Sequence, residues 1–150
     1  MKIDILTLFP EMFTGPLDWS IVKRAKEKGL VEIRVHNLRN WATDAYKTVD
    51  GRSYGGGPGM VMRVDVIDRA VEELRSEKTK IVLLDAGGEQ FSQKKAETIA
   101  SFEHVVFICG HYEGVDHRVH EKIAHEVISV GPYVLSGGEI PTMMVVDSVV

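Results

Sequence analysis

The side chains best suited to chemistry in this chain of 150 residues stand in a short segment bounded by glycines. Tyr112 and Glu113 lie between Gly110 and Gly114, directly after the apolar run 104–109. Such a run is typical of a strand covered on both faces, so we expect these side chains at the carboxyl end of a strand. A carboxylate and a phenol in that position can bind a ligand, but a solvated loop would have the same composition.

A second segment of this kind is richer in glycine and lies close by in the sequence. Residues 131–141 contain three glycines, two prolines and one serine, and they follow the short apolar run 127–130. Neighbouring strand ends form one crevice in an open α/β sheet, and glycine lets a ligand approach the backbone closely. The two segments together therefore predict a site that wraps a flat, polar small molecule with main-chain hydrogen bonds.

The third glycine-rich segment, residues 50–60, has five glycines in eleven residues and is predicted to be an irregular loop. A flexible linker is one interpretation, but Tyr54, Pro58 and Met60 favour an ordered segment. The chain has no G-x-G-x-x-G after its first predicted strand and no G-x-x-x-x-G-K-[ST]. Dinucleotide and nucleoside-triphosphate binding therefore lack support from motifs.

Histidine and cysteine give no indication of a metal site or of thiol chemistry. His117 and His120 could share one helix face, but a zinc site needs a third or fourth ligand. We interpret the histidines at 111–125 as solvent-facing polar residues and predict no metal. The lone Cys109 excludes an internal disulfide, suits a reducing cytoplasm, and is expected to be a small core residue. No signal-peptide pattern or membrane-length apolar run is present, so we expect a cytoplasmic protein without a membrane partner.

The charge is unevenly distributed along the chain, although the net charge is only −4. Residues 20–63 hold nine Lys and Arg against four Asp and Glu, interleaved with Trp41, Tyr46 and Tyr54. Basic and aromatic residues together are typical of a surface that binds RNA phosphates and a splayed-out base. For the four basic residues at 23–28, the solvent-exposed face of a helix is as good an interpretation as RNA binding.

Alternating strands and helices predict one α/β domain over residues 1–150, with a mostly parallel sheet flanked by helices. The expected strands are 3–8, 31–36, 80–84, 105–109 and 127–130. The expected helices are 17–28, 64–75, 93–100, 118–124 and one from Met143 onward. Residues 85–88 are expected to form a loop that joins the same crevice.

Segments 54–60, 110–116 and 133–141, together with the opening 6–13, resemble the bacterial tRNA (guanine-N1)-methyltransferase over essentially the whole chain. This resemblance implies a SPOUT-type fold with a deep C-terminal trefoil knot. It also implies S-adenosylmethionine as methyl donor, guanosine 37 of tRNA as substrate, and a homodimer. The apolar residues of 143–150 exceed what one helix stripe needs and agree with a dimer. A magnesium requirement is left open, because no residue pattern indicates one.

The resemblance also implies roles for individual residues. Glu113 would meet the amino group of the cofactor, Tyr112 and Gly110 would line its bend, and the later loop would hold adenine and ribose through its backbone. The implied cofactor-binding residues are Leu84, Gly88, Gly110, Tyr112, Glu113, Ser129, Val130, Gly131, Pro132, Tyr133, Val134, Leu135, Gly137, Gly138 and Pro141. The implied substrate-binding residues are Asp50, Pro58 and Gly59. The chain departs from the family at Ala86, His111 and Pro132, where proline, arginine and an acidic residue are common.

Methylation of guanine N1 requires a general base for the N1 proton and a cation near O6. The resemblance places both beyond Val150, so no catalytic residue is assigned within 1–150, and Asp50 is a candidate for an assisting role. We therefore expect the cofactor-binding domain of a longer enzyme, which binds S-adenosylmethionine but methylates weakly or not at all. A different nucleotide-binding α/β enzyme and a non-catalytic RNA-binding module stay open as alternatives.

Overall fold

The computed structural model describes residues 1–53, 56 and 59–150. Its centre is a five-stranded sheet in the order β2-β1-β6-β5-β7, in which every pair of neighbours is parallel. The strands are β1 (Lys2–Thr7), β2 (Glu32–Asn37), β5 (Lys80–Gln90), β6 (His104–Cys109) and β7 (Glu126–Ser129). The predicted α/β architecture with a mostly parallel sheet is confirmed.

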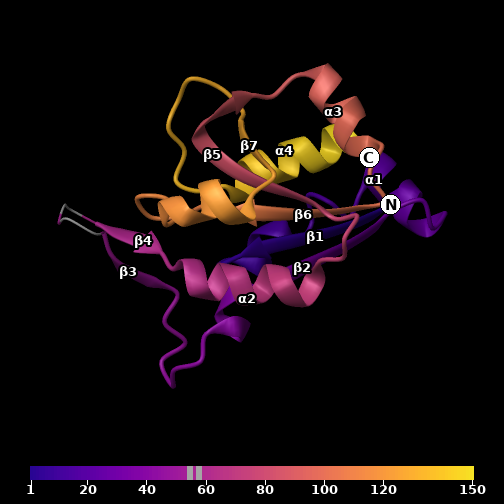
Figure 1. The fold of residues 1–150 in the computed structure, drawn as a ribbon. Coiled ribbons are helices and arrows are strands. Elements are labelled where there is room, and N and C mark those ends of the chain that lie inside the picture. Colours follow the sequence, from indigo (N-terminus) through magenta and orange to yellow (C-terminus); the bar gives the residue numbers. More distant parts are fainter. Residues whose placement is uncertain (54–55, 57–58) are drawn as a thin grey trace.

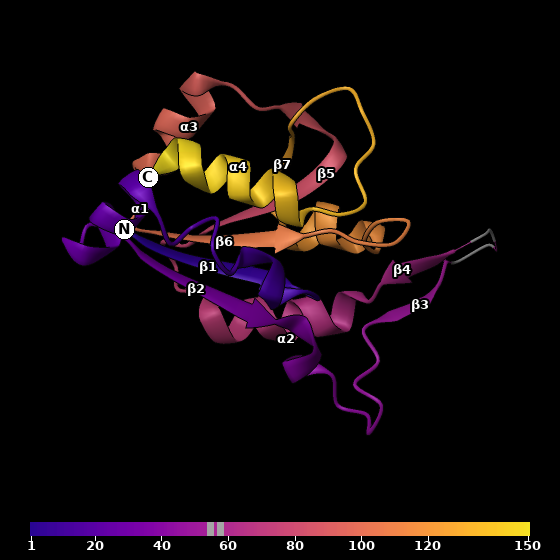
Figure 2. The same ribbon diagram turned by 180° about the vertical axis from the view of Figure 1, so that it is seen from behind.

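Helices cover both faces of this sheet (Figure 1, Figure 2). One core packs against α1 (Ser20–Glu27), α3 (Gln93–Ala100) and α4 (Glu139–Val149), and η1 (Pro10–Phe13) supplies one more residue to it. The other packs against α2 (Val64–Leu74), η2 (Leu38–Trp41) and η3 (Val119–Ile123). Successive side chains of β6 alternate between the two cores, as the two-residue period of a strand requires. Within the described residues, no helix has the length and apolar character needed to cross a membrane.

Segment 50–60 differs from its prediction as an irregular loop. It contains β3 (Asp50–Arg52) and β4 (Met60–Met62), which pair antiparallel and project from the body of the molecule (Figure 1). The glycine-rich sequence of this segment gives no local signal for a strand. The backbone of β4 also bonds to residues 113–116, which are far away in the sequence. Tertiary contacts, rather than local propensity, produce this hairpin.

Three further elements have different bounds or geometry from those predicted. Residues 85–88 are part of β5, where the register against β7 shifts between Leu84 and Glu89. The predicted helix 118–124 is the π-helix η3. Helix α4 begins at Glu139 rather than Met143, because Pro141 lies in its first turn, where a missing N–H breaks no helical hydrogen bond.

A buried carboxylate ties β1 to both of its neighbouring strands. Asp4 has no exposed surface, and its oxygens lie 2.6 Å from His36 Nε2 on β2 and 2.7 Å from His104 Nε2 on β6. Lys2 Nζ lies 2.8 Å away. Burial raises the pKa of the Asp4 carboxyl, but hydrogen bonds from His36, Lys2 and His104 outweigh that effect and hold the pKa well below its ordinary value.

We expect Asp4→Asn to lower the free energy of unfolding near pH 7 by about 3–5 kcal/mol, because it removes the buried carboxylate that pairs with Lys2 and bonds to both imidazole rings. The carboxylate's contribution is present above the unfolded-state pKa of about 3.9 and is lost as the pH falls toward the folded-state value. Urea unfolding at several pH values measures this, and the two stability curves should converge in acid. Asp68→Asn, on the exposed face of α2, is the control. Equal stability of Asp4→Asn and wild type near pH 7 would contradict the expectation.

Candidate functional site

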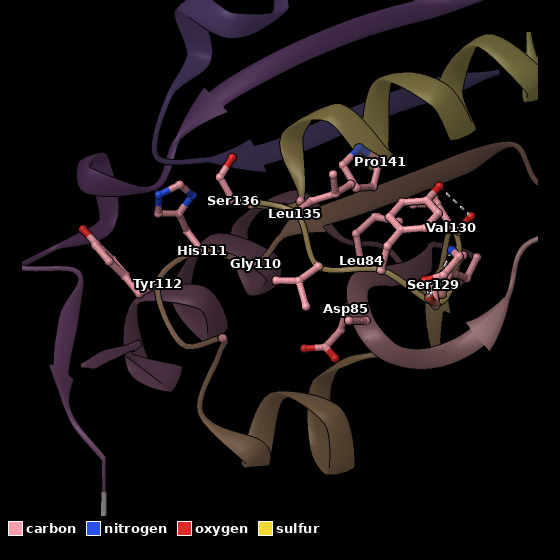
Figure 3. A pocket seen from close by; sticks show the side chains of 18 of the residues that line it. Leu84, Asp85, Gly110, His111, Tyr112, Ser129, Val130, Leu135, Ser136 and Pro141 are labelled. Carbon is pink, nitrogen blue, oxygen red and sulfur yellow. Dashed lines mark hydrogen bonds between the residues drawn. The ribbon is translucent and has the colours of Figure 1, made fainter. Parts of the chain in front are cut away.

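The carboxyl ends of β6 and β7, with the part of β5 where its pairing to β6 ends, enclose a cavity of about 260 Å³ (Figure 3). Its lining comes from three segments, 84–86, 110–114 and 128–138, with Pro141 from α4. These segments adjoin because β5 lies between β6 and β7 in the parallel sheet. The crevice expected from the two glycine-rich loops is thus present at the strand ends.

The structure brings together thirteen of the fifteen residues predicted to bind the cofactor. The cavity is lined by Leu84, Gly110, Tyr112, Glu113, Ser129, Val130, Gly131, Tyr133, Val134, Leu135, Gly137, Gly138 and Pro141. Their role toward a cofactor stays a prediction, but their convergence on one cavity is a finding.

Gly88 and Pro132 are not among the lining residues. Gly88 lies against β7, where a Cβ atom would meet the backbone of Ile128 at 2.7 Å, so this glycine serves close strand approach. Pro132 is exposed on the outer side of its loop. The implied substrate residue Pro58 lies outside the described residues.

The turn that carries Tyr112 and Glu113 is held in a conformation that side chains seldom adopt. Tyr112 has φ 60° and Gly114 has φ 113°, and a bulky residue with positive φ costs of order 1–3 kcal/mol. The amide of Glu113 donates to Met60 O at 3.0 Å, and the amide of Met62 donates to Gly114 O at 3.0 Å. Hydrogen bonds from β4 therefore offset the strain and fix the turn against the hairpin.

Glu113 occupies space that only a glycine at position 59 leaves free. A Cβ atom on Gly59, which has φ 85°, would lie 2.3 Å from Glu113 Cγ. The implied substrate residue Gly59 therefore adjoins the cavity by accommodating one of its lining side chains. In Figure 3 the Tyr112 ring turns away from the centre of the cavity, whereas Asp85 is directed into it.

The loop after β7 is fixed at both of its ends. Ser129 Oγ donates to Gly131 O at 3.1 Å, and the amide of Gly138 donates to Gly110 O at 2.7 Å. A Cβ atom on Gly138 would lie 2.8 Å from Cys109 Cα, so no side chain fits there. The loop is thereby pinned directly to the end of β6.

Glu139 was missed by sequence reasoning, yet its carboxylate lies against Gly137 of the cavity lining. Its side chain is 1% exposed, it accepts a hydrogen bond from Thr7 Oγ1 at 2.8 Å, and it lies 3.6 Å from His111 Nδ1. An acidic residue in the first turn of α4 is favoured by the helix dipole. The position of Glu139 directly after Gly137 and Gly138 was the sequence signal that could have indicated its place beside the cavity.

The interpretation of the histidines as solvent-facing is wrong for two of them. His111 packs against Phe9, and His120 Nε2 lies 3.4 Å from Asp85 Oδ2. His117 and His125 are exposed as predicted, although His125 Nδ1 also accepts a hydrogen bond from the amide of Ile81. Cys109 is fully buried, as expected, and this burial raises the pKa of its thiol well above the ordinary value. Among the residues that the structure describes, no group of three His, Cys, Asp or Glu side chains could hold a metal ion.

A second cavity, of about 640 Å³, lies between the β3–β4 hairpin and residues 115–118. Asp50, the implied substrate residue and candidate assisting base, lines this cavity and not the first. Arg52, Arg63 and Arg118 line it as well. Arg63 donates hydrogen bonds to the Asp65 carboxylate, and these raise the pKa of Arg63 and keep its guanidinium charged. Because β4 bonds to segment 113–116, the two cavities flank one shared turn.

Comparison with known proteins identifies the family. The family model described as "tRNA (Guanine-1)-methyltransferase TrmD" matches residues 1–150. The chain belongs to this family. A tRNA (guanine-N(1)-)-methyltransferase of Dictyoglomus turgidum is 53% identical over 150 residues, which are 100% of this chain and 61% of that protein. Proteins of the same name from Carboxydothermus hydrogenoformans and Bacillus cereus are 50% and 52% identical, covering 99% and 100% of this chain and 59% and 63% of theirs.

The chain therefore spans about three fifths of the length of the curated relatives it matches. The five-stranded parallel sheet agrees with the SPOUT-type α/β fold of this family. The deep trefoil knot stays a prediction.

The basic segment 20–63 is divided between two ends of the molecule. Helix α1 lies at the end that carries both chain termini, away from the hairpin (Figure 1, Figure 2). Two of its lysines pair with acidic neighbours, Lys23 with Glu27 and Lys26 with Asp18. The solvated-face interpretation thus describes α1 better, while Arg52 and Arg63 line the second cavity.

Proposed function

We propose that this chain is the S-adenosylmethionine-binding domain of a tRNA (guanine-N1)-methyltransferase that acts on guanosine 37. The observation that carries the proposal is that thirteen residues implied by the family resemblance line one cavity beside β5, β6 and β7. The names of the relatives support the reaction class. A reducing, cytoplasmic location agrees with tRNA as substrate and with the free thiol of Cys109.

The residues of the cavity fit this cofactor chemically. Glu113 offers a carboxylate to an ammonium group. Leu84, Ile128 and Pro141 offer apolar surface to a flat ring, and the backbone of 130–135 offers donors and acceptors for its polar edge. When bound, S-adenosylmethionine supplies the methyl group, and the enclosing loops hold it in one orientation, which is how positioning accelerates an in-line displacement.

The second cavity supports a nucleic-acid substrate. Arg52, Arg63 and Arg118 gather around it, and guanidinium groups bind phosphate oxygens in a bidentate manner. We propose that tRNA enters on this side, so that the target guanine reaches the shared turn at 113–116 with Asp50 and Gly59 beside it.

The proton of guanine N1 needs a base, and Asp50 is the carboxylate that the proposal places on the guanine side. Asp50 lies in strand β3 and lines the second cavity but not the first, and we assign it an assisting role only. We propose that the main base belongs to the further segment present in the longer relatives. A magnesium requirement is not proposed.

We expect Glu113→Gln to weaken the binding of S-adenosylmethionine about 10- to 100-fold, because a charge-assisted partner of the ammonium group is lost. Calorimetric titration of the purified chain measures this. Glu121→Gln changes an exposed carboxylate on η3, outside the cavity, and should leave affinity unchanged. An affinity that is the same in Glu113→Gln and wild type would remove Glu113 from the site.

For the reaction, we expect this chain alone to bind cofactor but to methylate tRNA at least about 100-fold more slowly than a chimera that adds the C-terminal part of the Dictyoglomus turgidum relative after Val150. A positioned base contributes about 10² to 10⁴ in rate, and the base is assigned to that part. Transfer of a radiolabelled methyl group to guanosine 37 is the measurement. Similar rates for the two proteins would place the base within 1–150.

Segment 143–150 does not leave the surplus apolar surface expected from the sequence, because Val145, Val146 and Val149 are buried in the core of the monomer. We further propose a homodimer, in which a second copy covers the exposed apolar side chains of Val134, Leu135, Ile140 and Met144. All four side chains are exposed, Val134 by 90%, and Ile140 and Met144 lie one turn apart on α4. At a protein concentration of about 50 µM, which is well above a Kd near 1 µM, light scattering should give twice the mass of one chain. Val134→Asp combined with Met144→Asp should give a monomer. A monomeric wild type would count against this interface.

A further inference from the structure

Asp85 is a second carboxylate of the first cavity, held from two sides. It follows Leu84 at the point where β5 leaves its pairing with β6, and Figure 3 shows its carboxylate directed into the cavity. Asp85 Oδ1 accepts a hydrogen bond from the amide of Gly87 at 2.8 Å, and Oδ2 lies 3.4 Å from His120 Nε2. The side chain remains 25% exposed, so it can meet a ligand.

The charges around the cavity are unbalanced. Its described lining residues include the carboxylates of Asp85 and Glu113 but no lysine or arginine. Two histidines adjoin these carboxylates: His111, a lining residue whose Nδ1 lies 3.6 Å from the buried Glu139, and His120 on η3, which faces Asp85. The cavity is therefore an environment that favours a positively charged ligand over a neutral one.

The two carboxylates come from different segments of the cavity wall. Glu113 packs against Gly59 on the hairpin side, whereas Asp85 comes from β5 and its Oδ2 would lie 3.9 Å from a Cβ atom on Gly114. Two carboxylates from separate segments can each serve a different cationic group of one ligand.

We infer that Asp85 selects the charged methyl donor over its demethylated product. This inference rests on the proposed function. S-adenosylmethionine and S-adenosylhomocysteine share an ammonium and a carboxylate group, and they differ by the methyl group that gives the donor its positive sulfonium. A carboxylate that faces the sulfur stabilises only the donor, whereas one that faces the ammonium stabilises both. Asp85 is assigned to the sulfur and Glu113 to the ammonium, so that the neutral product is released more readily.

His120 acts in this scheme as a positioning residue. The buried Nδ1 of His120 has no hydrogen-bond partner among the described residues. The other ring nitrogen, Nε2, lies 3.4 Å from Asp85 Oδ2. The π-helix η3 fixes the ring where it can orient Asp85 toward the cavity.

Calorimetry with three ligands tests this inference. The ligands are S-adenosylmethionine, S-adenosylhomocysteine and sinefungin, which carries an amine in place of the methylated sulfur. We expect Asp85→Asn to weaken the two cationic ligands about 5- to 10-fold and to change the affinity for S-adenosylhomocysteine by less than about twofold. Asp85→Glu should retain the preference, His120→Gln should reduce it without lowering the thermal unfolding temperature, and Asp68→Asn is the matched control.

The wild-type protein provides a second measurement that needs no variant. Raising the salt concentration from about 0.05 to 0.5 M should weaken S-adenosylmethionine relative to S-adenosylhomocysteine, since only the former gains from the charge of Asp85. Equal weakening of all three ligands in Asp85→Asn, or an unchanged ratio, overturns the inference and leaves the proposed function intact. Failure of wild type to bind any of the three ligands overturns both.

Discussion

Close contact between two loop backbones is the constraint on which the site depends. The amide of Gly138 donates to Gly110 O at 2.7 Å, and a Cβ atom at position 138 would lie 2.8 Å from the backbone of β6. Gly88 permits a similar approach between β5 and β7. Without these contacts the loop after β7 would not be held at the ends of the other two strands, and its backbone groups would not converge on a ligand.

Buried polar groups position the elements that carry this contact. Glu139 joins the start of α4 to Thr7 on β1 and lies close to His111, so the helix after the loop is tied to the centre of the sheet. Asp4 joins β1 to β2 and β6 at the opposite end of the strands. Buried charges of this kind are costly unless they are paired, and both carboxylates have partners from other strands or loops. The pairing fixes strand positions that apolar packing alone would leave less specific.

Much of this arrangement could be predicted from local patterns, and the rest depends on contacts between distant residues. The apolar runs of β1 and β6 and the capped helix α3 were predicted nearly at their observed bounds, because each has a strong local pattern. The crevice was predicted because parallel strands end at one edge. The β3–β4 hairpin could not be predicted, since its partner segment is 113–116. The roles of Asp85 and Glu139 depend likewise on His120 and Thr7, which only the fold brings near.

Amide chemical shifts can locate cofactor binding in the cavity beside β5, β6 and β7. In ¹⁵N-labelled protein titrated with S-adenosylhomocysteine, the account predicts the largest shifts in segments 84–86, 110–114 and 129–138, which line the cavity. Amides of α1 and β2 should remain unshifted. Shifts confined to the β3–β4 hairpin and residues 115–118, or no shifts under saturating ligand, would contradict it.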